Sequence, residues 1–466
     1  MDLIDAAREL IAIDTSPDSG TREVAQWLKT KAEQLNLDFL DQEDSFNGVE
    51  QSNVMISVKD LLQDESKFNE DFLLVSHLDT VDPGSGLLWT ENQFNPFNLI
   101  IKDGYLHGLG VADGKLDFLC KLEALSQWQN SEYQDRSTKL IRRPVLLGTY
   151  GEEIGMHGML RYIRKNKNKN KAKYALIGET TDLNIIHGTK GYAVIEIKIP
   201  FSKEEQAYRS QHDLSESATT QTRIFNATNL KEKGGYWSTK ENAIDKIFKY
   251  LLQIPEGIVL MEVDAGVSHN VFPLHGMVEF DVVSGIQNTM AQKLKQLYYS
   301  LTELRGQFLR FNDAEFSPSQ PQLNISTIKT VEGELYLTAM FLFPPLVTEI
   351  DYQNWLNQIK DYVQLNLNGD IRLVDYKKPY KISKDSDFIK KCLELSKENN
   401  LSCDLITLPK TNESSLLSRI GVECISFGAG IREGNTHSPS EMVKISDLNL
   451  SVEFYKKALS KFCIGE

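Results

Sequence analysis

Three short apolar runs in this chain each lead into a histidine or a carboxylate. They cover residues 72–75, 144–149 and 174–177, and they are followed by His77 with Asp79, by Glu152 with Glu153, and by Glu179. Uninterrupted runs of this length are typical of strands that are buried on both faces of a parallel sheet. Apolar residues at helical spacing lie between the first two runs, so the chain is predicted to form an α/β fold around a central, mostly parallel twisted sheet.

The polar residues after these runs are expected to meet at one edge of the sheet. Ligands of open α/β sheets bind at the carboxyl ends of the strands. His77 and Asp79 are two positions apart, so they point to the same side of an extended chain, and Asp113 stands at a predicted helix start. A single acidic residue there is commonly a helix cap, and the pair Glu152–Glu153 alone would favour a helix dipole. Several unpaired carboxylates at one edge would repel one another, which favours a bound cation.

Composition narrows the class of protein. The 466 residues carry a formal net charge of −14, which argues against a nucleic-acid-binding face. The basic run 161–171 is interpreted as a solvated helix end. The five cysteines form no CxxC pair, which indicates reduced thiols and a cytoplasmic protein. We see no signal peptide and no apolar stretch that would span a membrane.

The pattern of the chain changes near residue 189. Residues 189–377 are predicted to form an inserted α+β domain, with helices on one face of a sheet. The earlier alternation of strands and helices then resumes. The catalytic domain is therefore expected to be discontinuous, made of residues 1–188 and 378–466.

The order of the motifs resembles the M20 family of metallopeptidases and amidohydrolases, which includes deacetylases, desuccinylases, dipeptidases and carboxypeptidases. Each motif alone is only weak evidence for the family, but all of them occur in the expected order. The matching segments are Ser76–Val81, Asp103–Lys115, Gly151–Gly155, Gly178–Thr180, Lys190–Gly191, Gly428–Gly430 and His437–Glu441. The resemblance implies a zinc-peptidase-like catalytic domain with an inserted lid domain, which mediates dimers in many relatives, so a monomer or a homodimer is expected.

The resemblance also implies two divalent metal ions, with Zn²⁺ expected and Co²⁺ or Mn²⁺ able to substitute. His77 and Glu179 would bind one ion, Glu153 and His437 would bind the other, and Asp113 would bridge both. The peptide bond after the bridging aspartate is often cis in this family, and here that bond would be Asp113–Gly114.

Two further residues receive catalytic roles from the resemblance. Asp79 would hydrogen-bond His77 and fix its tautomer, as partners of metal-binding histidines commonly do. Glu152 would be the general base for a water that bridges the metals, and it would pass the proton to the leaving amine.

The inserted domain departs from the family pattern. No histidine stands where the lid normally supplies one to the oxyanion, and Lys231, Lys233, His212 or His269 are the alternatives. Losing one such donor costs about a hundredfold or more in rate. The usual substrate-binding arginine is also missing, and Arg223 or Arg432 are the remaining candidates. Further contacts with substrate are predicted for Asn270, Gly428, Gly430 and Thr411.

The expected function is hydrolysis of an amide bond in a small molecule, an N-acyl amino acid or a short peptide. A deacetylase or desuccinylase is the first expectation and a dipeptidase or carboxypeptidase the second. The alternative from another class is a catalytically weak metal-binding relative with a regulatory role, which the altered lid favours.

Overall fold

The chain divides into two compact units. The computed structural model describes residues 1–62, 68–133, 138–166, 172–212, 220–227, 241–254, 257–268, 272–431 and 434–465. One unit consists of Met1–Thr189 with Tyr380–Glu466, and the other is Lys190–Pro379. The second unit is thus inserted in the chain between two segments of the first. No helix of the described residues combines the length and the apolar character needed to cross a membrane.

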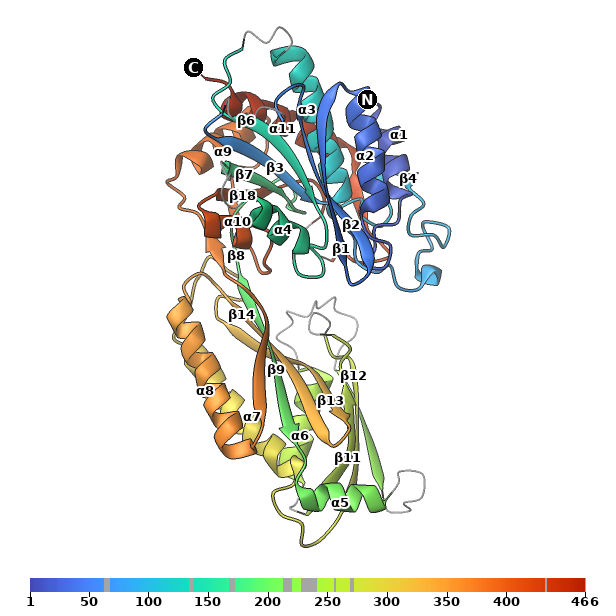
Figure 1. Ribbon diagram of the computed structural model, residues 1–466, viewed down its shortest axis with the longest axis vertical. Helices are drawn as coiled ribbons and strands as arrows, with labels where there is room; N and C mark the ends of the chain where they lie inside the picture. Colours follow the sequence, from blue (N-terminus) through green and yellow to red (C-terminus); the bar gives the residue numbers. More distant parts are fainter. Residues whose placement is uncertain are drawn as a thin grey trace. The chain divides into compact units, whose positions relative to one another are not determined.

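A nine-stranded mixed sheet forms the centre of the first unit, in the order β1-β2-β6-β3-β7-β18-β8-β16, with β17 paired to β8 (Figure 1). The strands β6, β3, β7 and β18 run parallel, whereas β1 and β2 form an antiparallel edge. This arrangement confirms the predicted α/β fold with a parallel centre. The strands are β1 (Leu37–Phe46), β2 (Val49–Val58), β3 (Asp71–His77), β6 (Arg143–Thr149), β7 (Ala172–Gly178), β8 (Ile185–Thr189), β16 (Tyr380–Lys381), β17 (Leu405–Leu408) and β18 (Glu423–Phe427). A small separate sheet contains β4 (Ile100–Lys102), β5 (Tyr105–His107) and β19 (Met442–Lys444).

Helices cover both faces of the central sheet. They are α1 (Leu3–Ile11), α2 (Arg22–Gln34), α3 (Lys115–Glu132), α4 (His157–Lys165), α9 (Asp387–Glu398), α10 (Ser414–Leu417) and α11 (Ile445–Cys463). Phe72 and Leu74 of β3 belong to the core that also contains residues of α3 and α11. Leu73 and Val75 belong to a second core on the other face, with residues of α4 and α10. Because alternate side chains of a strand face opposite ways, an apolar run without alternation is what this two-sided burial requires.

The inserted unit is an antiparallel sheet with helices packed against it, in the strand order β10-β12-β11-β13-β14-β9-β15. The side chains of Ile195, Ile197 and Ile199 alternate into one core, which they share with three helices, α6, α7 and α8. The strands are β9 (Gly191–Pro200), β10 (Gln221–Asn226), β11 (Ile258–Ala265), β12 (His275–Val282), β13 (Gln322–Val331), β14 (Glu334–Phe343) and β15 (Asp370–Lys377). The helices are α5 (Lys203–Gln211), α6 (Ala243–Gln253), α7 (Met290–Phe308) and α8 (Glu349–Leu367).

Candidate metal centre

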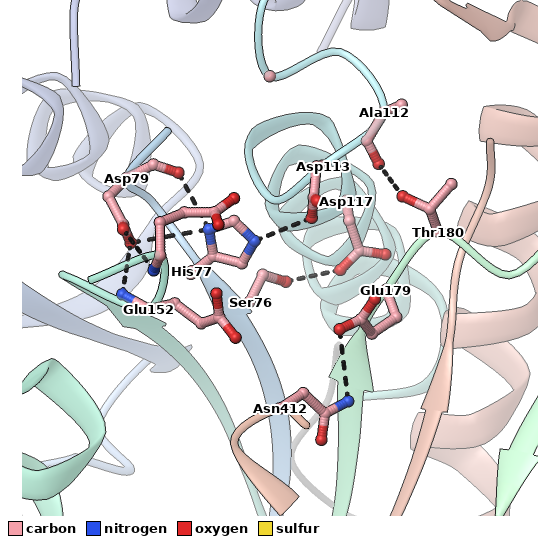
Figure 2. A network of polar contacts seen from close by, with 12 residues as sticks. Ser76, His77, Asp79, Ala112, Asp113, Asp117, Glu152, Glu179, Thr180 and Asn412 are labelled. Atoms are coloured by element: carbon pink, nitrogen blue, oxygen red, sulfur yellow. Dashed lines mark hydrogen bonds and ion pairs between the residues drawn. The ribbon is translucent and has the colours of Figure 1, made fainter. Parts of the chain in front are cut away.

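The parallel strands bring the predicted ligands to one edge of the sheet. His77 is the last residue of β3, Glu179 follows β7, and β6 leads into the glutamate turn, Gly151–Glu153. Asp113 lies just before α3, and Figure 2 shows the His77 ring pointing towards it. The geometry therefore assembles side chains that are distant in sequence.

Asp113 lies between the two predicted histidines. Its Oδ1 is 3.0 Å from Nε2 of His77, and its Oδ2 is 3.2 Å from Nε2 of His437. One carboxylate thus presents a different oxygen to each imidazole. This is the arrangement that a bridging ligand between two cations requires.

Glu153 completes one side of the group. Its Oε1 lies 2.7 Å from Nε2 of His437. Ligand atoms of His77, Asp113 and Glu153 all lie within 4.8 Å of one another. Imidazole nitrogens mixed with carboxylate oxygens suit Zn²⁺, Co²⁺ and Mn²⁺, so the donor set fits divalent cations.

Glu179 contacts an amide and an ammonium group rather than a histidine. Its Oε1 lies 3.5 Å from Nδ2 of Asn412, and its Oε2 lies 3.4 Å from Nζ of Lys410. Figure 2 shows Asn412 approaching this carboxylate. Lys410 Nζ is also 4.0 Å from Oδ2 of Asp113. Lys410 was not among the predicted site residues. The signal for it was its place just beyond β17, since a strand end is where polar site residues gather.

The charges of this group shift its pKa values. The negative charge of Glu153 raises the pKa of His437 to about 11. Burial lowers the pKa of His77, but the hydrogen bond to Asp113 contributes to a larger opposing effect and the net shift is upward. Burial likewise disfavours the charged form of Asp113, yet Lys410 and the two histidines hold its pKa well below the usual range. The nearby carboxylates thus favour the charged forms of His77 and His437.

Asp79 holds the glutamate turn as well as His77. Its carboxylate accepts the backbone N–H groups of Glu152 and Glu153, each at 3.1 Å. The His77 Nδ1 atom is 3.0 Å from the main-chain oxygen of Asp79 but 3.6 Å from its carboxylate, which is beyond a good hydrogen bond. The contact that orients His77 thus comes from the Asp79 main chain, and the carboxylate positions the turn.

Glu152 is the remaining carboxylate of the group. Burial raises its pKa well above the ordinary value, and the neighbouring charge of Glu153 adds to the shift. A raised pKa makes the ionised carboxylate a stronger base. Its surroundings therefore increase the affinity of the Glu152 carboxylate for a proton.

The turn that carries Asp113 is fixed by a residue that the sequence reasoning did not assign to the site. Oε1 of Glu441 accepts the backbone N–H groups of Gly110, Ala112 and Asp113 at 3.0, 2.9 and 3.3 Å. The prediction of a cis peptide bond after Asp113 is wrong. Among the described residues the cis peptide bond is Ser317–Pro318, so the Asp113–Gly114 bond is trans. Gly114 makes the turn instead with φ +86°, and a Cβ there would lie 2.6 Å from His77 Cε1.

A buried ionic network lies next to the strand ends. Lys121 is fully buried and donates to the Val75 oxygen at 2.6 Å, to Ser76 Oγ at 3.0 Å and to Asp117 Oδ2 at 2.6 Å. Asp117 also accepts from Ser76 Oγ at 2.6 Å (Figure 2). A further hydrogen bond comes from the Tyr455 hydroxyl at 2.5 Å. The network joins the strand that carries His77 to α3 and α11.

The predicted substrate contacts fare differently. The Gly428 N–H donates to Thr181 Oγ1 at 3.1 Å, so it is already used within the fold. Gly430 adopts φ +101°, and its carbonyl accepts from the Asp182 N–H at 3.0 Å. Thr411 Oγ1 is buried and has no hydrogen-bond partner among the described residues.

The other candidates fall in the inserted unit or outside the described residues. Asn270, His269, Lys231, Lys233 and Arg432 lie outside the part of the chain that the structure describes. The His212 ring stacks on Tyr208, and its Nδ1 atom lies 2.9 Å from the main-chain oxygen of Tyr208. Arg223 is exposed on β10.

Similar proteins were found by sequence and by structure. Acetylornithine deacetylase of Pasteurella multocida is 37% identical over 127 residues, which is 27% of this chain and 30% of that protein. The same-named protein of Photorhabdus laumondii is 30% identical over 190 residues, 41% of this chain and 43% of that one. The chain thus matches less than half the length of these relatives.

Among solved structures, an M20 family metallo-carboxypeptidase, Sso-CP2 of Sulfolobus solfataricus, has a TM-score of 0.62 at 16% identity, covering 99% of both chains. Aminoacylhistidine dipeptidase of Vibrio alginolyticus has a TM-score of 0.61 at 16% identity, covering 100% of this chain and 96% of that chain. At such low identity these likenesses show the fold. The profile of peptidase family M20/M25/M40 matches residues 73–461, which is most of the chain. This match confirms the resemblance drawn from the motifs: the chain belongs to peptidase family M20/M25/M40.

Proposed function

We propose that this protein is a metal-dependent hydrolase that cleaves the amide bond of an N-acyl amino acid or a short peptide. The observation that carries the proposal is the placing of Asp113, with one oxygen 3.0 Å from His77 and the other 3.2 Å from His437. Membership of a peptidase family supports the same chemistry.

Two cations would be held by His77 with Glu179 and by Glu153 with His437, with Asp113 shared. When bound, such ions polarise a carbonyl group and lower the pKa of water. The protein's own contribution would be to fix these side chains and to keep Glu152 beside them without binding the same ion as Glu153.

Glu152 would act as the general base. It would take a proton from the attacking water and deliver it to the nitrogen of the leaving amine. The hydrogen bonds from Asp79 to the glutamate turn would hold the base in place.

A deacylase is the first candidate for the reaction, because the sequence relatives are acetylornithine deacetylases. A dipeptidase or carboxypeptidase is the second, because the structural neighbours include such enzymes. The residues proposed to replace the missing lid histidine remain Lys231, Lys233, His212 and His269, as predicted from the sequence. We further propose that the protein is cytoplasmic and acts as a monomer or homodimer.

The test combines metal analysis with a substrate panel. Purified protein is expected to hold divalent metal and to hydrolyse at least one member of a panel of N-acetyl amino acids, N-succinyl amino acids and dipeptides. Glu152→Gln should lower kcat by about a hundredfold or more with metal content unchanged, whereas Glu33→Gln, at an exposed position of α2, should have no effect. The hydrolase proposal fails if metal-loaded protein cleaves nothing in the panel, and Glu152 loses its role if its variant is as active as the wild type.

A further inference from the structure

A lysine ammonium lies within the group of predicted metal ligands. Nζ of Lys410 is 3.4 Å from Oε2 of Glu179 and 4.0 Å from Oδ2 of Asp113. These are two of the three side chains that would hold the ion on the His77 side. Glu153 is paired with His437 instead, at 2.7 Å. The ammonium therefore pairs with carboxylates on the His77 side, whereas Glu153 on the other side pairs with an imidazole.

Charge counting makes Lys410 a competitor. The ligand carboxylates of Asp113, Glu153 and Glu179 bring three negative charges, which two divalent cations would already outweigh. The ammonium would be an additional positive charge a few ångströms from one ion, and like charges so close repel strongly where water is scarce. An ion at Glu179 and the ammonium at Glu179 thus disfavour each other.

Lys410 has a route away from Glu179. Its side chain is 34% exposed, whereas that of Glu179 is only 5% exposed. A lysine side chain has four flexible carbon atoms, so the ammonium can move to solvent while the carboxylate stays in place.

We propose that Lys410 is a tethered cation that competes with metal for Glu179, so that the two metal positions fill unequally. The position at Glu153 and His437 fills first and tightly. The position at His77 and Glu179 fills second, and only when the Lys410 side chain withdraws. This inference rests on the metal pair of the proposed function and concerns the order and strength of metal binding.

The experiment measures metal binding to the full chain. Metal-free wild type, Lys410→Met, Lys410→Arg and Glu179→Gln are titrated with Zn²⁺ by calorimetry, and bound metal is counted by elemental analysis. Lys29→Met, at an exposed position of α2, controls for the loss of one positive charge. The tight first step serves as an internal control for folding.

The wild type is expected to show one tight and one weak step. Lys410→Met should tighten the weak step by about tenfold or more and leave the tight step unchanged, while Lys410→Arg and Lys29→Met should behave like the wild type. Glu179→Gln should lose the weak step alone. An unchanged weak step in Lys410→Met overturns the role of Lys410 and leaves the hydrolase proposal standing. If neither the wild type nor any variant binds metal, the proposed function fails as well. If the protein binds metal but hydrolyses no substrate of the panel, only the proposed hydrolase reaction fails.

Discussion

Replacing Lys121 by methionine should strongly destabilise the first unit. The ammonium is fully buried and makes three hydrogen bonds, to the Val75 oxygen, Ser76 Oγ and Asp117 Oδ2. Removing one partner of a buried ion pair costs about 3–5 kcal/mol, because the other charge stays buried without compensation. Asp117 would keep its hydrogen bonds from Ser76 and Tyr455, so we expect the lower end, about 3 kcal/mol.

A double-mutant cycle separates charge from packing. Asp117→Asn removes the buried negative charge, so the double variant with Lys121→Met should be more stable than the sum of the two single losses predicts, by about 1–2 kcal/mol. The exposed-site variant Lys29→Met should stay within about 0.5 kcal/mol of the wild type.

The assay must follow the first unit by itself, because a chain of two units does not guarantee a single unfolding transition. Hydrogen exchange of peptides from β3 and α3, measured at increasing urea concentrations, reports the free energy of unfolding there. Two results would refute the reasoning: a loss below about 1 kcal/mol for Lys121→Met, or additive losses in the cycle.

Three further predictions concern the surroundings of the candidate metal centre. Burial raises the pKa of Glu413 to about 7, whereas an unfolded glutamate titrates near 4.3, so its protonation favours the folded state. The stability from this group is complete below about pH 4 and decreases by about 3–4 kcal/mol as the pH rises to 7. Glu413→Gln should remove this decrease in the free energy of unfolding, measured in urea at pH 5 and 8. A pH dependence equal to that of the wild type would contradict the prediction. Asp79→Asn should weaken metal binding by about 10–100-fold in calorimetry by releasing the glutamate turn, and wild-type affinity would count against that role. Gly114→Ala should cost at least about 1 kcal/mol, because φ is +86° and the Cβ would meet the His77 ring, and wild-type stability in urea would contradict it.

The strands of the candidate metal centre were predictable because their signal is local. An apolar run such as 72–75 must be buried on both faces wherever it occurs, and the residue that ends it must lie at the sheet edge. The antiparallel edge strand β1 (Leu37–Phe46) was not predicted, since its many charged residues hide the alternation of a half-buried strand.

The contacts around the ligands were less predictable. The sequence favoured a carboxylate contact from Asp79 to His77, but the structure uses the Asp79 main chain for His77 and the carboxylate for the glutamate turn. Adjacent positions allow both arrangements, and the path of the β6 turn selects one. Nor does spacing reveal that Glu441 anchors the turn before Asp113.

By itself the sequence determined the fold class and the family, because the apolar runs of the strands and the order of the motifs can be read directly along the chain. The tertiary structure alone decided which oxygen of Asp113 faces which histidine, that Lys410 lies against Glu179, and that Tyr455 supports Asp117. Asp117 and Tyr455 are 338 positions apart. Contacts over such separations depend on how strands and helices pack. A local sequence pattern does not specify the distance between two charged side chains that meet only after this packing.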